Sequence, residues 1–368
     1  MVNGHVNLDD LPTPALLLDL DRLEANVARM AHRARALGVR LRPHIKPHKC
    51  VEIAERQRAT GADGITVSTV YEARVFADAG FTDITWAFPF VPSRLGEAAE
   101  VARRAHLGVV VDDARAADLL ASSGHAWDVW LKVDCGYHRA GIDPEDPDAV
   151  GLARTLTRSP GITFRGILTH SGHAYHGHNR DEIEAAALQE RDVMTAFAAK
   201  LRAAGVAVPA VSVGSTPALS VIRDLTGVDE IRPGNYVFHD YTQLRLGSCG
   251  STDAALTVLS SVVSASRRRN HCVIDAGALA LSKDRGPEHL GARTMGEIIA
   301  DYPSGRLHPS HRVVSVSQEH GIVNARLDVG SRVRILPNHS CLTAAQFDTY
   351  HVVRGNQLVD CWKIWRGR

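Results

Sequence analysis

The chain is dominated by a regular alternation of two sequence patterns between residues 20 and 245. Short apolar, β-branched runs are each followed by a turn and a stretch rich in Ala, Arg and Glu with helical spacing. Such alternation is typical of a parallel sheet, because a helix usually makes the crossover between parallel strands. The predicted strands are Val39–Pro43, Gly64–Thr69, Asp83–Phe88, Leu107–Val111, Trp127–Asp134, Phe164–His170, Ala210–Thr216 and Glu230–Tyr236.

The stretches between these strands supply the helices of the same fold. Several begin with Asp or Pro, as helix starts prefer. Eight strands with crossovers in this length predict a (β/α)8 TIM barrel rather than a doubly wound sheet. No GxGxxG motif follows an early strand, which disfavours a dinucleotide-binding fold. The predicted helices include Asp21–Leu37, Lys49–Thr60, Tyr71–Ala79, Pro92–Ala105, Asp181–Ala204 and Pro217–Asp224.

The composition and the hydrophobic pattern of the sequence change after Leu246. Runs rich in Ser, Val and Thr alternate there with Gly, Asn and Pro turns, which predicts a smaller β-rich domain. The early run TPALLLDL could add a strand to it. We therefore expect a barrel domain over residues 20–245 and a β-rich domain built from residues 1–19 and 246–368. The runs are ALTVLSSVVSAS, NHCVIDAGALALS, HRVVSVSQEHGIVN, SRVRILPNHSC and TYHVVRGNQLVDCWKIW.

Charge and cysteine content exclude several classes of partner. Lys and Arg total 42 against 41 for Asp and Glu, which gives no electrostatic reason to expect a nucleic acid or an anionic membrane. The six cysteines are scattered without a CxxC pair, which suggests reduced thiols. The start lacks a signal-peptide pattern, and no apolar run is long enough to span a bilayer. We expect a cytoplasmic enzyme with a small-molecule substrate.

Two groups of residues fall where barrels carry their chemistry, at the carboxyl ends of strands. Lys46, in His44-Ile45-Lys46, follows the first strand, and an amine near apolar walls and other cations has a lowered pKa that favours Schiff-base formation. The alternative is a basic, solvated helix start. His170 and His173 end the sixth strand.

Two glycine-containing turns follow the seventh and eighth strands, where barrels often bind phosphate through backbone N–H groups. Both turns combine a glycine, which allows close backbone approach, with polar side chains that can donate hydrogen bonds. Two ordinary turns are the alternative. The residues of this predicted cup are Gly214, Ser215, Thr216, Gly234, Asn235 and Tyr236.

A further pair, His339 and Cys341, comes directly after the β-like run SRVRILPN. On an extended chain, side chains two positions apart point to the same face, so the pair could close on one metal ion. Imidazole and thiolate suit zinc, and two protein ligands would leave positions for water or substrate. A half-buried His and Cys on a strand is the alternative. Asp275, Ser282, Asp284, Glu319 and His320 are possible supporting groups, whereas Arg267–Arg269 is expected to be a solvated turn.

Taken together, RPHIKPHK, HSGHAYH, GSTP, RPGNY and PNHSC resemble the fold-type III pyridoxal phosphate enzymes, in the group of D-threonine aldolase and eukaryotic-type D-serine dehydratase. This resemblance covers nearly the whole chain and implies an alanine-racemase-like architecture. It implies that Lys46 binds the cofactor covalently, that Tyr175 lies near the pyridine nitrogen and that Arg139 lies near the phenolic oxygen. It also implies a divalent metal (Zn, Mn or Mg) at His339 and Cys341, and a homodimer.

The resemblance further implies a lyase acting on D-3-hydroxy amino acids, with Lys46, His44 and His170 as catalytic candidates. The dehydratases carry His-x-Cys and the aldolases His-x-Asp, so His339 and Cys341 favour dehydration to a 2-oxo acid and ammonia. Retro-aldol cleavage to glycine and an aldehyde stays open. Two more classes also stay open: an amino-acid racemase, which needs no metal, and a cofactor-carrying protein without catalysis.

Overall fold

The computed structural model describes residues 7–367, which form two compact units. The barrel unit comprises Met30–Lys46, Ile53–Gly234 and Gly367. The β unit comprises residues 7–29 together with Pro47–Glu52 and Asn235–Arg366. Residues 1–6, which belong to the expected 1–19 segment, and Arg368 lie outside the described residues.

The barrel unit contains an eight-stranded parallel sheet in the order β2-β9-β8-β7-β6-β5-β4-β3. A parallel bridge between His44 and Thr66 joins the two end strands. All eight predicted strands and the TIM-like class are confirmed. The strands are β2 (Arg40–Leu41), β3 (Ile65–Val67), β4 (Asp83–Pro89), β5 (His106–Val111), β6 (Trp127–Lys132), β7 (Ile162–Leu168), β8 (Val211–Val213) and β9 (Glu230–Ile231).

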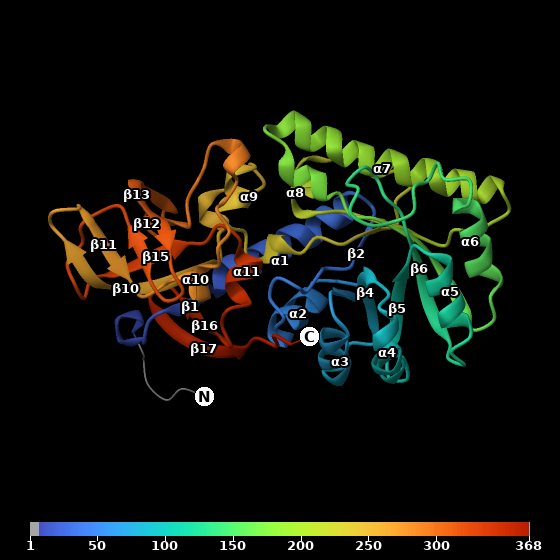
Figure 1. Ribbon diagram of the computed structural model, residues 1–368, viewed down its shortest axis with the longest axis horizontal. Helices are drawn as coiled ribbons and strands as arrows, with labels where there is room; N and C mark the ends of the chain where they lie inside the picture. Colours follow the sequence, from blue (N-terminus) through green and yellow to red (C-terminus); the bar gives the residue numbers. More distant parts are fainter. Residues whose placement is uncertain (1–6, 368) are drawn as a thin grey trace. The chain divides into compact units, whose positions relative to one another are not determined.

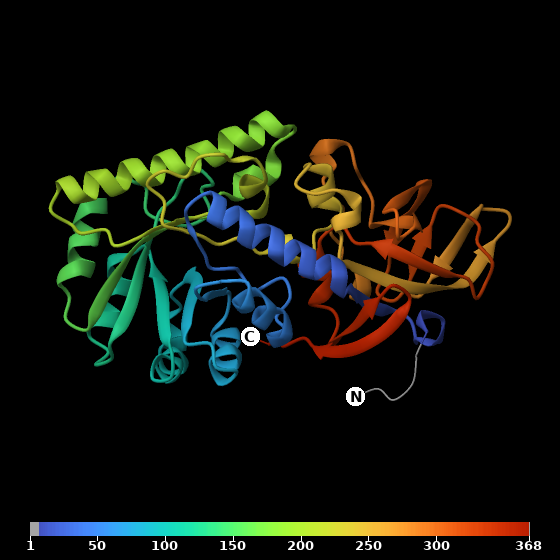
Figure 2. The ribbon, with the colours of Figure 1, turned by 180° about the vertical axis from the view of Figure 1, so that it is seen from behind.

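Helices lie on the outside of these strands (Figures 1 and 2). Several begin at side chains that accept a hydrogen bond from the first helical turn: Thr69 caps α3, Asp113 caps α5 and Asn179 caps α7. The helices are α1 (Leu20–Ala36), α2 (Val51–Ala59), α3 (Val70–Asp78), α4 (Leu95–Ala102), α5 (Ala114–Ala121), α6 (Ala149–Arg158), α7 (Arg180–Ala203) and α8 (Thr216–Val221). α7 is the longest, with 24 residues.

Charged side chains are buried inside the barrel and are paired there. Arg42 donates to Glu230 at 2.7 Å and to Asp83 at 2.7 Å, and only 2% of the Arg42 side chain is exposed. Glu230 accepts a further hydrogen bond from Ser212, to which Arg232 also donates. An unpaired buried charge is costly, so these ion pairs and hydrogen bonds are what stabilise charged side chains in the barrel interior.

The β unit contains a nine-stranded sheet in the order β11-β14-β13-β12-β15-β10-β1-β16-β17. A further pairing of β11 with β10 closes β10, β15, β12, β13, β14 and β11 into a ring. The run TPALLLDL supplies β1, which is antiparallel to β10 and parallel to β16. The strands are β1 (Ala15–Asp19), β10 (Leu256–Ser266), β11 (His271–Ile274), β12 (Gly296–Asp301), β13 (Arg306–Val316), β14 (Gly321–Val323), β15 (Arg332–Leu336), β16 (Thr349–Arg354) and β17 (Gln357–Lys363).

Two predicted β-runs of this unit end in short helices. The run NHCVIDAGALALS forms β11 and then α10 (Ala278–Leu281), and SRVRILPNHSC forms β15 and then enters α11 (Ser340–Ala344). The expectation that His339 and Cys341 lie on an extended strand is therefore wrong, because Cys341 is helical. The Asp240 carboxylate, just before α9 (Tyr241–Arg245), accepts from the Ser340 N–H and so satisfies a donor at the start of α11.

Within residues 7–367, no helix combines the length and the apolar character that crossing a membrane requires. None of the six cysteines forms a disulfide. The cytoplasmic location stays a prediction.

Candidate active site

Lys46 lies in the loop that follows β2 of the barrel unit, and its side chain is exposed. Backbone hydrogen bonds fix this loop: His44 N–H donates to the Pro233 carbonyl and Ile45 N–H to the Thr66 carbonyl. The ring of His44 turns back on the loop, where its Nδ1 accepts from the Lys46 N–H at 3.3 Å. The amine is thus carried at the carboxyl end of a barrel strand by a well-anchored backbone, with His44 in a supporting position.

His170, in the loop after β7, lies among positive charges. Burial first, and then the charges of Lys46 and Arg139, hold the pKa of His170 well below its usual value, and Lys132 and Arg232 act in the same direction. Burial, followed by the neighbouring Arg232 and Arg139, also lowers the pKa of Lys132 to about 8. The carboxyl end of the barrel is therefore an electropositive region containing a neutral imidazole, which suits an anionic ligand.

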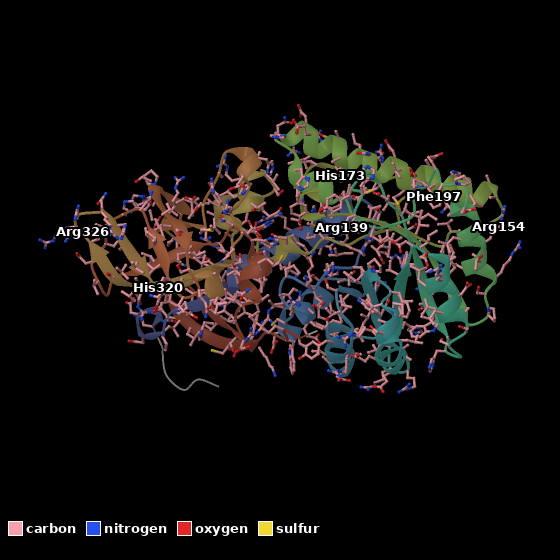
Figure 3. All side chains as sticks on the ribbon, viewed as in Figure 1. Arg139, Arg154, His173, Phe197, His320 and Arg326 are labelled. Carbon is pink, nitrogen blue, oxygen red and sulfur yellow. The ribbon has the colours of Figure 1, made fainter. Side chains whose placement is uncertain are left out.

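Arg139, which follows β6, has an aromatic neighbour that the sequence did not single out. The guanidinium carbon of Arg139 lies 5.0 Å from the centre of the Tyr137 ring. The same ring lies 6.3 Å from those of His170 and His173. Figure 3 labels Arg139 and His173 in this part of the barrel unit. Tyr137 thus joins the loops after β6 and β7. Tyr175, the tyrosine predicted to lie near the pyridine nitrogen, is half-buried in the 3-10 turn Gly172–His176.

The turn after β8 is buried throughout Gly214, Ser215 and Thr216. Gly214 has a φ of 109°, a conformation that glycine adopts readily. Its N–H donates to Glu190 on α7 at 3.0 Å, so this donor is already used within the protein. Ser215 Oγ accepts from the Ala218 N–H and lies 3.2 Å from Ser171 Oγ. The Gly214 N–H thus has its partner within the protein, and the Ser215 hydroxyl links this turn to Ser171.

Glu190 is a further residue that sequence reasoning missed. It is 2% exposed and accepts hydrogen bonds from the Ser171 N–H at 2.9 Å and the Ser171 hydroxyl at 2.8 Å, in addition to Gly214. Burial raises the pKa of this carboxyl, an effect that these donors partly offset. Glu190 therefore ties the loop after β7 to the loop after β8.

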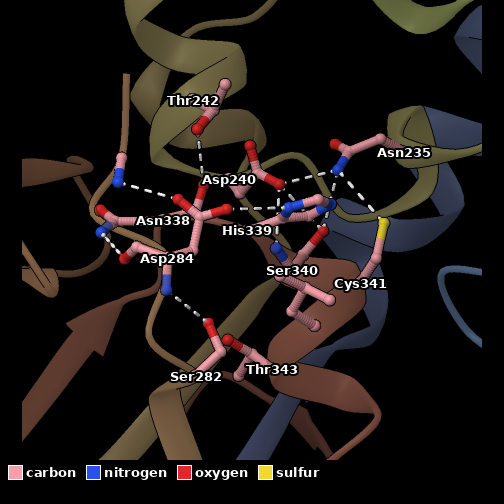
Figure 4. A network of polar contacts seen from close by, with 12 residues as sticks. Asn235, Asp240, Thr242, Ser282, Asp284, Asn338, His339, Ser340, Cys341 and Thr343 are labelled. Carbon is pink, nitrogen blue, oxygen red and sulfur yellow. Dashed lines mark hydrogen bonds and ion pairs between the residues drawn. The ribbon is translucent and has the colours of Figure 1, made fainter. Parts of the chain in front are cut away.

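The β unit carries the second polar cluster, shown in Figure 4. His339 Nδ1 lies 3.2 Å from a carboxylate oxygen of Asp284, and the His339 and Cys341 side chains contact each other. Burial lowers the pKa of His339, but Cys341 and Asp284 outweigh it and raise this pKa well above the usual value. With Nδ1 held by Asp284, His339 Nε2 is the nitrogen left for a metal.

Asn235 and Asp240 complete this cluster. The Asn235 amide nitrogen donates to Asp240 at 2.7 Å and to Ser340 Oγ at 3.0 Å, and it lies 3.8 Å from Cys341 Sγ. The predicted cup residue Asn235 thus turns its side chain toward the His339–Cys341 pair. Tyr236 beside it is fully buried, with 1% exposure.

The histidine–cysteine pair passes a simple test for a metal site. Imidazole nitrogen and thiolate sulfur are zinc ligands, and a carboxylate that holds the second ring nitrogen is typical of metal-bound histidine. No group of three or more His, Cys, Asp and Glu side chains suited to a metal occurs within residues 7–367. A metal here would have two side-chain ligands, with other positions left for water or substrate.

Other candidates play structural parts. Asp275 accepts from Ser260 and Thr13 within the β unit, and Ser282 accepts from the Asp284 N–H. Glu319 and His320 are exposed in the turn between β13 and β14. Asp284, one of the predicted supporting groups, contacts His339 directly.

Comparison with known proteins bears on both units. Residues 18–242 match the alanine racemase N-terminal domain, and residues 255–353 match a putative serine dehydratase domain. The chain is 40% identical to D-threo-3-hydroxyaspartate dehydratase of Delftia sp. (strain HT23), over 97% of this chain and 98% of that one. It is 35% identical to D-serine dehydratase of Dictyostelium discoideum, over 99% of both chains. The chain belongs to the D-serine dehydratase and D-threonine aldolase family of fold-type III pyridoxal phosphate enzymes.

Solved structures of this family have the same fold. The Delftia dehydratase superposes with a TM-score of 0.93 at 40% identity, covering 98% of this chain and all of that one. D-threonine aldolase from Filomicrobium marinum superposes with a TM-score of 0.87 at 33% identity, covering 98% of each chain. The Delftia enzyme has also been solved with one cysteine replaced by alanine, in a metal-free form. The predicted family and its alanine-racemase-like architecture are confirmed.

The two residues that the sequence analysis missed, Tyr137 and Glu190, differ in the local signal that they carry. Tyr137 lies two residues before the predicted Arg139, in the run DCGYHRAGI that follows β6, and could have been found there. Glu190 stands on α7 in a run, LQERD, that reads as a solvated helix face, so its burial depends on contacts remote in sequence.

Proposed function

We propose that this chain is a pyridoxal phosphate- and divalent-metal-dependent lyase that dehydrates D-3-hydroxy amino acids to a 2-oxo acid and ammonia. The observation that carries the proposal is the 40% identity, over nearly the full length of both chains, to a dehydratase of a D-3-hydroxy amino acid. The contact between the His339 and Cys341 side chains supports it. Retro-aldol cleavage is the second candidate, because a D-threonine aldolase shares the fold at 33% identity.

Most of the groups proposed to hold the cofactor belong to the barrel unit. Bound pyridoxal phosphate would act as an electron sink for the carbanion formed at the substrate α-carbon. Lys46 is proposed to bind it covalently, and the electropositive region with Arg139, Lys132 and Arg232 is proposed to favour its anionic groups. The cofactor phosphate is proposed to bind at Ser215, Thr216, Gly234 and Asn235, and Tyr175 to face the ring nitrogen.

Lys46 and His170 of the barrel unit are proposed to contact the reacting groups of the substrate. Lys46 Nζ would remove the α-proton of the substrate as general base. His170 is kept neutral by burial and by the positive charges around it, so it can accept a hydrogen bond from substrate without adding another positive charge. His44 is proposed to support the loop that carries Lys46.

His339 and Cys341 are proposed to hold the divalent metal, which would supply Lewis-acid assistance to departure of the 3-hydroxyl group. Support comes from the Delftia dehydratase, in which the structure with a cysteine replaced by alanine is metal-free. In that enzyme a histidine two positions before this cysteine has also been replaced by alanine, and the same spacing separates His339 from Cys341. Zinc and manganese are the proposed metals, and the homodimer stays a prediction.

Incubation of the purified enzyme with D-serine, D-threonine and D-threo-3-hydroxyaspartate tests the reaction type. Dehydration should give ammonia with pyruvate, 2-oxobutyrate and oxaloacetate respectively, whereas retro-aldol cleavage should give glycine from D-threonine. L-Serine is the matched control and should give no product. Equal amounts of glycine and acetaldehyde from D-threonine, with no 2-oxobutyrate, would establish the aldolase instead. Racemisation of these amino acids that persists after the metal is removed by a chelator, with no lyase product formed, would exclude both lyases.

Asp284→Asn should weaken metal binding by about 10- to 100-fold, because partners that orient a metal-bound histidine contribute that much. The amide can still accept from His339 Nδ1, but it lacks the charge that strengthens this hydrogen bond. Competition with a metal-binding dye measures the Zn²⁺ affinity directly. Asp275→Asn, a change of the same kind at the end of β11, is the control and should leave the affinity unchanged. An unaltered affinity in Asp284→Asn would contradict the role of this carboxylate.

A further inference from the structure

Asp240 lies between the turn that carries Asn235 and the loop that carries His339 and Cys341 (Figure 4). Its Oδ2 atom accepts hydrogen bonds from Asn235 Nδ2 at 2.7 Å, from the Ser340 N–H at 2.9 Å and from the Ser340 hydroxyl at 3.1 Å. Its other oxygen, Oδ1, accepts from the Gln243 N–H at 2.9 Å and caps α9. One buried carboxylate, with 1% exposure, therefore joins both loops.

Further contacts make the two loops a single assembly. The start of α9 donates to the chain before His339: Tyr241 N–H to the Pro337 carbonyl, and the Thr242 hydroxyl to the Asn338 carbonyl at 2.8 Å. The Asn235 amide also reaches across to Ser340 Oγ and toward Cys341 Sγ. A buried acceptor left without its donors is costly, so displacement of either loop disturbs the partners of the other.

We propose that Asp240 couples the metal site to the cofactor-phosphate turn, so that metal and pyridoxal phosphate bind cooperatively. The proposal rests on the proposed function, in which His339 and Cys341 hold the metal and Asn235 belongs to the phosphate turn. Asp240 acts as a positioning residue: it touches neither ligand, and it fixes Asn235 and Ser340 in one arrangement.

The sign of the coupling follows from this shared arrangement. Whichever ligand binds first orders the residues around Asp240, and the second ligand then binds to an assembly that is already ordered. Coupling between two binding sites is reciprocal, so the cofactor must raise metal affinity by the same factor by which the metal raises cofactor affinity. Allosteric couplings are typically about 5- to 150-fold, and we expect a factor in this range.

The test is a pair of titrations on the full chain. Zn²⁺ affinity is measured by competition with a metal-binding dye, with and without saturating pyridoxal phosphate. Pyridoxal phosphate affinity is measured by quenching of tryptophan fluorescence, with and without saturating Zn²⁺. The wild type should show an equal gain, of about fivefold or more, in both directions. Asp240→Asn should reduce the gain to none, because an amide can still cap α9 through its oxygen but turns an NH₂ group toward three donors.

Two further variants keep the test decisive. Asp113→Asn, the same exchange at the cap of α5 in the barrel unit, should retain the full gain. Ser340→Ala removes one donor to Asp240 and one acceptor of the Asn235 amide, and should reduce the gain even if Asp240→Asn does not fold. A wild type that binds both ligands independently overturns the coupling, as does a full gain in Asp240→Asn or in Ser340→Ala. A wild type that binds neither ligand, or binds Zn²⁺ equally well after His339→Ala, instead refutes the proposed function.

Discussion

Replacing Lys46 by alanine should abolish turnover and remove the absorbance band of covalently bound pyridoxal phosphate. The substitution removes both the amine that attaches the cofactor and the base proposed to take the α-proton. General acid–base catalysis alone contributes about 10²- to 10⁴-fold, so we expect kcat to fall by at least about 10⁴-fold when both roles are lost. Absorbance spectra before and after borohydride treatment, with product assays at saturating cofactor, measure the two effects.

Matched lysine variants separate the amine from the positive charge. Lys46→Arg keeps a cation at this exposed position but cannot form the covalent bond, and it should be as inactive as Lys46→Ala. Lys49→Arg, three residues further along, should retain the absorbance band and the activity. A Lys46→Ala enzyme with the normal band would show that another amine holds the cofactor and would refute the barrel site as proposed.

The barrel could be predicted because its determinants are local. Strands buried on both faces read as apolar, β-branched runs, as in the predicted segments Leu107–Val111 and Trp127–Asp134, which form β5 and β6. Helix starts could also be read from residues that helix starts prefer, such as Pro217 in the first turn of α8. The placement of Lys46 at a strand end followed from the same pattern, since a barrel strand must be followed by a loop at its carboxyl end.

What could not be predicted depends on contacts between distant segments. The local sequence SRVRILPNHSC reads as a strand to its end, yet Ser340–Ala344 is helical, with Asp240 accepting from the Ser340 N–H. That acceptor is supplied by a residue 100 positions earlier. The Gly214 N–H, expected to face an anion, instead donates to Glu190 on α7, which is also a residue distant in sequence. The pattern of one sequence therefore predicts secondary-structure elements and candidate functional residues. It does not predict which buried acceptor pairs with each hydrogen-bond donor.

His339→Ala and Cys341→Ala should each lose the metal and most dehydratase activity while retaining the cofactor band at saturating pyridoxal phosphate. Lewis-acid assistance to a leaving oxygen is worth several kcal/mol, so we expect kcat to fall by about 10²- to 10³-fold. Metal content by elemental analysis and 2-oxo acid formation measure the two losses. The retained band distinguishes this defect from that of Lys46→Ala. Cys361→Ala, at an exposed cysteine on β17, is the control and should behave as wild type.

The chemistry of the cysteine position can then be separated from its bulk. Cys341→Asp should recover metal that Cys341→Ala loses, because a carboxylate oxygen also ligates divalent ions. Added Zn²⁺ should restore a chelated wild type but not His339→Ala, since imidazole is then missing whatever the metal concentration. Full activity in His339→Ala with no bound metal would show that the 3-hydroxyl departs without Lewis-acid help. In that case a side chain would have to protonate the leaving oxygen. His170 lies near Lys46 and is held neutral, so it could donate this proton only after it had first accepted one.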